Sequence, residues 1–229
     1  MVTWRFFSYF SNGIGEVEPL EDPEIKDVVR EVSQKMNFKI HEVYVVTPKK
    51  PILNAVHVKF AGRFNYIYIV GPLKNFFSIE EITIIIAHEI AHAKKKHVMK
   101  LLITRKLATI LTLALTSIFI MIYGLLISPY LQVSSFSPFQ FIFVLLVASL
   151  MVLFIPMLIV CYFSRKMELE ADIEAAKLYG TDLCIKTLKK LENFYHKKTK
   201  RSRLLTLIST HSSLEKRIKN LEKISKVIK

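Results

Sequence analysis

Long uncharged and short amphipathic segments alternate along the chain, and they predict most of its secondary structure. The longest apolar block, residues 107–164, contains no charged residue or histidine and is interrupted by Pro129 and Pro138. It predicts two helices, residues 107–127 and 139–163, each long enough at about 1.5 Å per residue to cross a hydrocarbon core of about 30 Å. We expect Pro156 to kink the second helix or to free a backbone carbonyl locally. The alternative, a buried hairpin in a soluble core, would require a partner protein in a chain of 229 residues.

The segments that flank this block have the patterns of ordinary helices and strands. Asp22 followed by Pro23 predicts a helix start, and apolar residues then recur at helical spacing as far as Met36. From residue 39 the pattern is typical of β-structure, and residues 55–60 and 64–70 flank a turn, which predicts a hairpin. Capping boxes open two further helices, one at Ser78-Ile79-Glu80-Glu81 and one at Ser212-Ser213-Leu214-Glu215.

Together these elements predict an α+β fold that is mainly helical and contains a small β-sheet or hairpin. A two-helix transmembrane hairpin interrupts it. We expect three parts: residues 1–106 as the N-terminal cytoplasmic part, residues 107–163 as the membrane hairpin, and residues 164–229 as a C-terminal helical cytoplasmic part. The aromatic cluster of residues 4–10 is too short for the core of a cleavable signal peptide, and it suits an interfacial anchor or packing against the core.

Composition and charge support a membrane protein of fixed orientation. Hydrophobic residues make up 52% of the chain, mean hydropathy is +0.33 and the net charge is +14. The basic residues concentrate beside the apolar block, so they favour a lipid bilayer over nucleic acid, for which no motif is present. Because the loop between the two spans carries no basic residue, both flanks are expected to face the cytoplasm of a multi-pass cell-membrane protein. The two cysteines form neither a disulfide framework nor a zinc site.

Candidate chemistry lies in the helix that the first capping box opens. His88-Glu89-Ile90-Ala91-His92 is an H-E-x-x-H pentapeptide. Histidines four residues apart on a helix are separated by about 40°, so both can bind one Zn²⁺ ion, the single cofactor that we expect. Glu89 lies about 100° from His88, which suits a general base that acts on water beside the metal.

A catalytic zinc site needs a third protein ligand, and the sequence offers two kinds. His97 is nine residues from His88 and on the opposite helical face, so it is a poor ligand. Glu168 and Asp172 follow the second apolar span and lie four apart on one helical face. One of them could bind the metal while the other orients a ligating histidine. A membrane hairpin would return this helix to the side of His88.

At this point the sequence resembles the HtpX-type membrane zinc metallopeptidases, relatives of the CAAX prenyl protease and of Oma-type peptidases. The resemblance covers about residues 40–220 and implies a gluzincin-like site, with zinc bound by His88, His92 and Glu168 and with Asp172 behind them. It also implies that His211 steadies the oxyanion and that Arg217 pairs with an active-site acid, although Ser212 replaces the family's usual proline. Asn54 and Ala55 match its Asn-Ala element at the substrate site. HtpX-type chains commonly have two further spans ahead of these elements, where this chain has only residues 4–10.

We therefore expect a membrane-embedded zinc endopeptidase that hydrolyses unfolded or misfolded proteins, including membrane proteins, in quality control or stress. Its partners would be polypeptide substrates and the lipid bilayer, with no nucleic acid; no pattern indicates an oligomeric state. A substrate would lie as an added strand along the hairpin of residues 55–70. The alternatives are a non-proteolytic membrane adaptor that keeps a structural zinc ion and a basic nucleic-acid-binding protein at the membrane.

Overall fold

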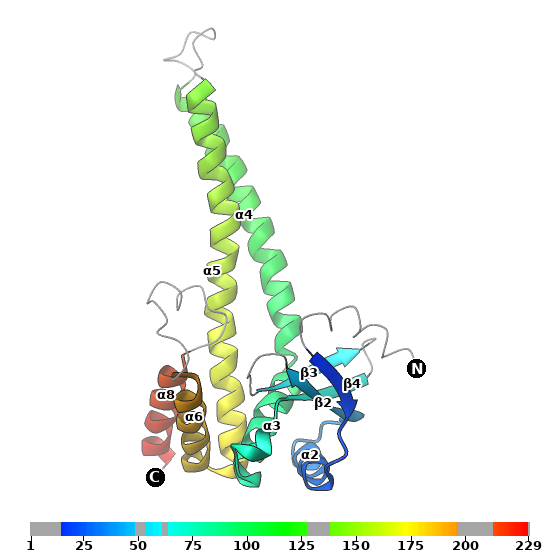
Figure 1. The fold of residues 1–229 in the computed structure, drawn as a ribbon. Helices are drawn as coiled ribbons and strands as arrows, with labels where there is room; N and C mark the ends of the chain where they lie inside the picture. The colour runs from blue at the N-terminus through cyan, green and yellow to red at the C-terminus, as the bar shows by residue number, and fades with distance from the viewer. Residues whose placement is uncertain (1–14, 49–53, 61–63, 128–137, 197–212, 229) are drawn as a thin grey trace. The chain divides into compact units, whose positions relative to one another are not determined.

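The structure is a computed structural model that describes residues 15–48, 54–60, 64–127, 138–196 and 213–228 (Figure 1). It divides the chain into two units, which are considered separately. One unit contains residues 97–166, and the other contains all of the remaining described residues. Helix α5 runs through the boundary between them, from Pro138 to Tyr179.

The sheet of the larger unit has four described strands in the order β1-β2-β4-β3. Their bounds are Gly15–Pro19 for β1, Glu42–Pro48 for β2, Asn54–Phe60 for β3 and Phe64–Val70 for β4. The antiparallel β3–β4 pair confirms the predicted hairpin, whereas the central β2–β4 pair is parallel. Strand β1, which pairs antiparallel with β2, was not predicted. Within the described sheet β3 is an edge strand.

Helices cover one face of this sheet. Alternate residues of β2 and β4, including Val43, Val45, Ile67 and Ile69, belong to one core cluster with the apolar residues of α2 (Pro23–Lys35) and α3 (Ile79–Lys94). Asp22 caps α2 through the backbone N–H groups of residues 24 and 25, as its sequence predicts. The opposite face of the sheet carries tyrosines from β2 and β4, which form a second, smaller cluster.

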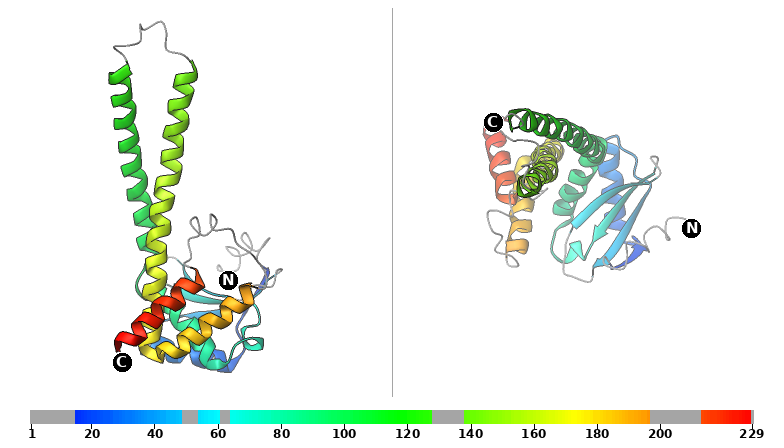
Figure 2. Two further views of the ribbon diagram at one scale, coloured as in Figure 1. Left: turned by 90° about the vertical axis from the view of Figure 1, so that its left-hand side faces the viewer. Right: turned by 90° about the horizontal axis from the view of Figure 1, so that it is seen from above.

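Two more helices complete the larger unit. Helices α6 (Thr181–His196) and α8 (Leu214–Ile228) lie side by side (Figures 1 and 2), and α6 also contacts α3. The predicted capping box of α3 is present: Ser78 Oγ accepts from the Glu81 N–H, and the Glu81 carboxylate accepts from the Ser78 N–H. Glu81 is buried and also binds Lys190 of α6 at 2.6 Å, so the start of α3 is fixed to α6.

The smaller unit contains the apolar block. Its helix α4 extends from His97 to Ile127, and the first part of α5 supplies the second apolar helix, which includes Pro156. Both helices are long and apolar enough to cross a membrane, and most of their apolar residues are exposed in the structure. Both are longer than the expected spans, because helical structure continues through the flanking charged residues. The segment that carries Glu168 and Asp172 is the end of this same helix α5.

Candidate metal centre

Helix α3 presents the two histidines of the H-E-x-x-H sequence on one side. The Nε2 atoms of His88 and His92 lie 3.1 Å apart, and both side chains are mostly buried. Four residues make slightly more than one helical turn, which brings the two imidazoles together. Ionic contacts fix α3 near both of its ends, through Glu81 and Lys190 at the start and through Lys95 and Glu174, 3.3 Å apart, just after its end.

Helix α5 brings Glu168 to these histidines. Its Oε2 lies 3.6 Å from His88 Nε2, and its Oε1 lies 3.8 Å from His92 Nε2. Two ligand atoms of a tetrahedral zinc ion, each about 2.0–2.1 Å from the metal, are about 3.3 Å apart. The histidine pair is close to this spacing, and each carboxylate oxygen lies somewhat farther from its own histidine, so the three side chains converge on one point where an ion could bind. Two imidazoles and one carboxylate are also a donor set that suits zinc and leaves a fourth position open.

The described residues offer no other cluster of this kind. Among them, the His, Cys, Asp and Glu side chains close enough to share a metal ion are those of His88, His92 and Glu168, with ligand atoms within 4.8 Å of one another. His97 is buried at the start of α4 and is not a member of this group. The distant carboxylate, rather than the nearby histidine, therefore completes the three-donor set.

Asp172 lies behind the three donors and holds one of them. Its Oδ1 is 2.9 Å from Nδ1 of His88, the ring nitrogen that does not face His92. This contact places the proton of the neutral imidazole on Nδ1 and leaves the Nε2 lone pair for a metal. Asp172 follows Glu168 by four residues on α5, so a single helical face supplies both carboxylates.

Arg217 of α8 joins the two carboxylates and also lies against His88, with its Nη2 3.3 Å from Nδ1 and 3.4 Å from Nε2 of that ring. Its Nε donates to Asp172 Oδ2 at 2.7 Å, its Nη2 donates to Oδ1 of the same side chain, and its Nη1 lies 3.1 Å from Glu168 Oε2. The planar guanidinium thus binds both oxygens of Asp172 through Nε and Nη2, and it contacts Glu168 through its third nitrogen, Nη1. The family resemblance implied that Arg217 pairs with one active-site acid, but not that it contacts both carboxylates.

The charges of this cluster set the protonation states. Burial raises the pKa of Asp172, but Arg217 and His88 outweigh burial and lower it, so this carboxyl stays ionised. Burial and the charge of Arg217 lower the pKa of His88, yet Asp172 and Glu168 outweigh them and raise it to about 9. In the absence of a metal, both ring nitrogens of His88 are therefore protonated at neutral pH, and zinc must displace the proton on Nε2.

The remaining predicted site residues are less completely described. Glu89 follows His88 in α3 and is partly buried, next to the metal donors in sequence. Asn54 begins β3, where its partner in the register is Val70, and Ala55 is buried against the core. His211 and the aromatic cluster of residues 4–10 lie outside the described residues.

One structural element of the site has no signal in the sequence. The ion pair between Glu81 and Lys190 joins residues 109 positions apart. The capping box identified Glu81 only as a partner of Ser78, and Lys190 is one of many lysines in the chain. The structure buries Glu81 at the third position of this capped helix, and Lys190 supplies the second partner that a buried carboxylate needs.

Comparison with known proteins decides the family. The family model described as Peptidase family M48 matches residues 19–225. The chain belongs to peptidase family M48. This confirms the resemblance seen in the sequence. Membership of this family supports a metallopeptidase role, and the cluster of His88, His92 and Glu168 could hold the metal ion.

Individual M48 relatives match shorter parts of the chain. The CAAX prenyl protease 1 of Saccharomyces cerevisiae is 32% identical over 104 residues, 44% of this chain and 23% of the relative. A protease HtpX homolog of Thermodesulfovibrio yellowstonii is 27% identical over 103 residues, 42% of this chain and 36% of the relative. These matches span well under half the length of either curated relative.

A solved structure matches over a larger part of the fold. The crystal structure of S. mikatae Ste24p aligns with 90% of this chain and 52% of its own, with a TM-score of 0.65 and 23% sequence identity. It confirms the predicted fold class, a mainly helical α+β domain with a small sheet and two apolar helices.

Proposed function

We propose that this M48 chain is a zinc-dependent endopeptidase whose metal is bound by His88, His92 and Glu168. The observation that carries the proposal is the convergence of two imidazoles and one carboxylate: the two Nε2 atoms are 3.1 Å apart, Glu168 Oε2 lies 3.6 Å from that of His88, and Glu168 Oε1 lies 3.8 Å from that of His92. The contact between Asp172 and His88 Nδ1 supports it further, because ligating histidines usually donate their second ring N–H to a carboxylate or carbonyl.

The residues around the metal would divide the work of peptide hydrolysis. Zinc, when bound, supplies a Lewis acid that polarises the scissile carbonyl and makes water more acidic. Glu89 takes a proton from the attacking water and passes it to the nitrogen of the leaving amine. His211, whose role rests on the family resemblance, offers a hydrogen bond to the oxyanion of the tetrahedral intermediate.

The substrates that we propose are unfolded or misfolded polypeptides, including membrane proteins, in a quality-control role. Strand β3, with Asn54 and Ala55 at its start, is an edge strand that contacts α3, the helix of the H-E-x-x-H sequence. A substrate in extended conformation could add to this edge through backbone hydrogen bonds, which tolerate many side chains. Such pairing requires an unfolded segment.

We further propose that the protein is a multi-pass cell-membrane protein with its active site facing the cytoplasm. Basic residues flank the two apolar helices, whereas the sequence between the helices carries none. In a variant without Cys161 and Cys184, a single cysteine at position 134 should react with an impermeant thiol reagent in intact cells, and one at Asn193 of α6 should not. Labelling at position 193 alone would reverse the orientation.

The proposed activity is tested with purified full-length chain in detergent and casein as substrate. Cleavage should stop when a chelator removes zinc, return when zinc is restored, and be nearly absent in Glu89→Gln, which keeps the shape of the side chain but not the proton acceptor. A wild-type protein that retains zinc and cleaves nothing would instead favour the non-proteolytic adaptor. Full activity in Glu89→Gln would refute the proposed mechanism.

A further inference from the structure

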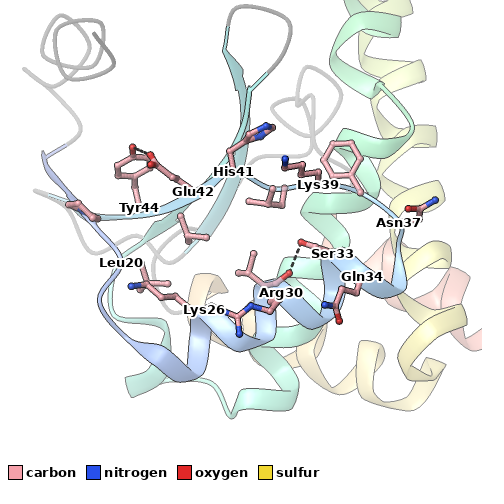
Figure 3. A pocket seen from close by; sticks show the side chains of 15 residues that line it. Leu20, Lys26, Arg30, Ser33, Gln34, Asn37, Lys39, His41, Glu42 and Tyr44 are labelled. Atoms are coloured by element: carbon pink, nitrogen blue, oxygen red, sulfur yellow. Dashed lines mark hydrogen bonds between the residues drawn. The ribbon is translucent and has the colours of Figure 1, made fainter. Parts of the chain in front are cut away.

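A groove lies between helix α2 and the start of strand β2, among residues that take no part in the metal centre. It has a volume of about 680 Å³, within the usual range for ligand pockets. Its walls are α2 on one side and residues 38–44 on the other (Figure 3). We propose that this α2–β2 groove recruits acidic polypeptide segments that contain apolar residues; the inference rests on the proposed peptidase function.

Hydrogen bonds hold the end of the groove in one conformation. Asn37, with φ of 49°, ends α2 in the left-handed region, and the Phe38 N–H then bonds to the Ser33 carbonyl at 2.9 Å. Asn65 of β4 fixes the next residues, because its Nδ2 donates to the Lys39 carbonyl and its backbone N–H donates to His41 Nδ1. A wall that is already ordered loses little conformational entropy when a ligand binds.

The lining combines an apolar floor with a basic rim. Leu20 and Val29 are buried in the floor, with Val43 beside them. On the rim, Lys26 and Arg30 lie one turn apart on α2, and Lys39 lies on the facing wall. These positive charges come from both sides of the groove (Figure 3).

Negative charge on the lining is limited. The lining contains one carboxylate, that of Glu42, which accepts a hydrogen bond from the Tyr44 hydroxyl. Arg30 binds Asp27 at 2.9 Å, but this pair is well exposed, and exposed pairs contribute little free energy. The groove therefore keeps a positive rim that complements acidic side chains.

The distribution of polar groups favours a peptide over a single lipid headgroup. Amide side chains also line the groove, that of Gln34 near the end of α2 and that of Asn37 just after it (Figure 3). An extended peptide presents carboxylates and backbone carbonyls at several points along its length. A lipid headgroup presents its charge at one point and would leave most of these groups unused.

Binding is measured by fluorescence anisotropy with the full chain carrying Glu89→Gln, so that no probe is cleaved. The probe is a labelled peptide of alternating Glu and Leu, and its matched control has Gln in place of Glu. We expect the acidic peptide to bind at least about tenfold more tightly than the control peptide. The charge reversal Lys26→Glu with Lys39→Glu should weaken acidic-peptide binding by about tenfold or more.

A second charge reversal, Lys223→Glu with Lys226→Glu on the exposed side of α8, changes net charge equally and should alter binding less than about twofold. Gln34→Trp fills the groove without changing charge and should also weaken binding. Equal loss in both charge-reversal variants, or no loss in the groove variants, would overturn the inference. So would displacement of the peptide by phosphatidylglycerol vesicles but not phosphatidylcholine vesicles, which would assign the groove to anionic lipid.

The two proposals can fail separately. Peptide binding that depends on the groove, in a wild-type protein that cleaves no casein, would reject only the peptidase function. Zinc-dependent casein cleavage with no effect of the groove variants on peptide binding would reject only the recruitment site.

Discussion

His88 Nδ1 lies 2.9 Å from Oδ1 of Asp172, on the face of α5 that also carries Glu168. One helix thus supplies both a proposed metal ligand and the carboxylate that orients another ligand. His88 contacts both carboxylates, so the orientation of its ring depends on the placement of α5.

We predict that Asp172→Ala lowers zinc affinity by about 10- to 100-fold, the usual effect of losing such an orienting partner. Without the carboxylate, the His88 ring can rotate and its Nδ1 proton loses its acceptor. Competition with a chromophoric chelator measures the affinity. Asp172→Asn keeps an oxygen acceptor and should lose less; an Asn variant as weak as the Ala variant would show that charge, rather than orientation, matters most.

Replacement of Arg217 should affect the metal-free protein most. Arg217→Gln leaves Glu168 and Asp172 buried without their shared cation, and removal of one partner from such a pair costs about 3–5 kcal/mol. Bound zinc would restore part of the lost positive charge. The increase in unfolding temperature on zinc addition should therefore be larger in Arg217→Gln than in wild type, and an equal increase would contradict this electrostatic account.

The buried Glu81 should make stability depend on pH. Burial raises its pKa, but the hydrogen bonds from Lys190 and Ser78 and the charges of Lys190 and Lys186 outweigh burial and lower it. A lowered folded-state pKa gives stability that is present above the ordinary value of 4.5 and is lost as pH falls through the folded-state value. Glu81→Gln should therefore be less stable than wild type at pH 7, with the difference shrinking below about pH 4.5.

Chemical denaturation at several pH values measures this effect. The control is Glu21→Gln, a change at an exposed side chain, which should alter the free energy of unfolding by less than about 0.5 kcal/mol. A constant difference between wild type and Glu81→Gln from pH 7 to pH 3 would show that the contribution of Glu81 is not ionic.

His211 is predicted to act on the oxyanion and not on the metal. His211→Ala should reduce turnover by roughly 10²- to 10³-fold, as removal of one oxyanion donor does, while zinc content stays near that of wild type. Steady-state casein cleavage and atomic absorption on the same preparation test both parts. Loss of zinc would make His211 a ligand or a residue that supports the site.

Local sequence was enough to predict those parts of the site that lie within one helix. Helical spacing alone brings His88 and His92 together, and the capping box places the start of α3 correctly. For the third ligand, the sequence offered two candidate carboxylates, Glu168 and Asp172, which share a helical face. It did not show which of the two reaches the metal. That choice depends on how α5 packs against α3, and it was made only through the family resemblance.

The sequence did not predict those features that depend on tertiary contacts, or on a helix continuing because no residue ends it. Strand β1 was not predicted because it is short and contains two glutamates, which disfavour strands, so its pairing with β2 determines its structure. Helix α5 continues beyond the apolar span because no glycine or proline follows until Gly180, whose φ of 91° ends it. The contact of Arg217 with Glu168 requires α8 to pack beside α6, which no local pattern encodes.

Zinc content of Glu168→Ala tests the central claim most directly. The account holds that a carboxylate 76 positions after His92 completes the metal site, so its removal leaves two histidines and water as ligands. Atomic absorption on the purified variant, beside wild type and Glu89→Gln, should give about one zinc ion per chain for the latter two and far less for Glu168→Ala. A full zinc ion in Glu168→Ala would contradict the account and transfer the third ligand to another residue.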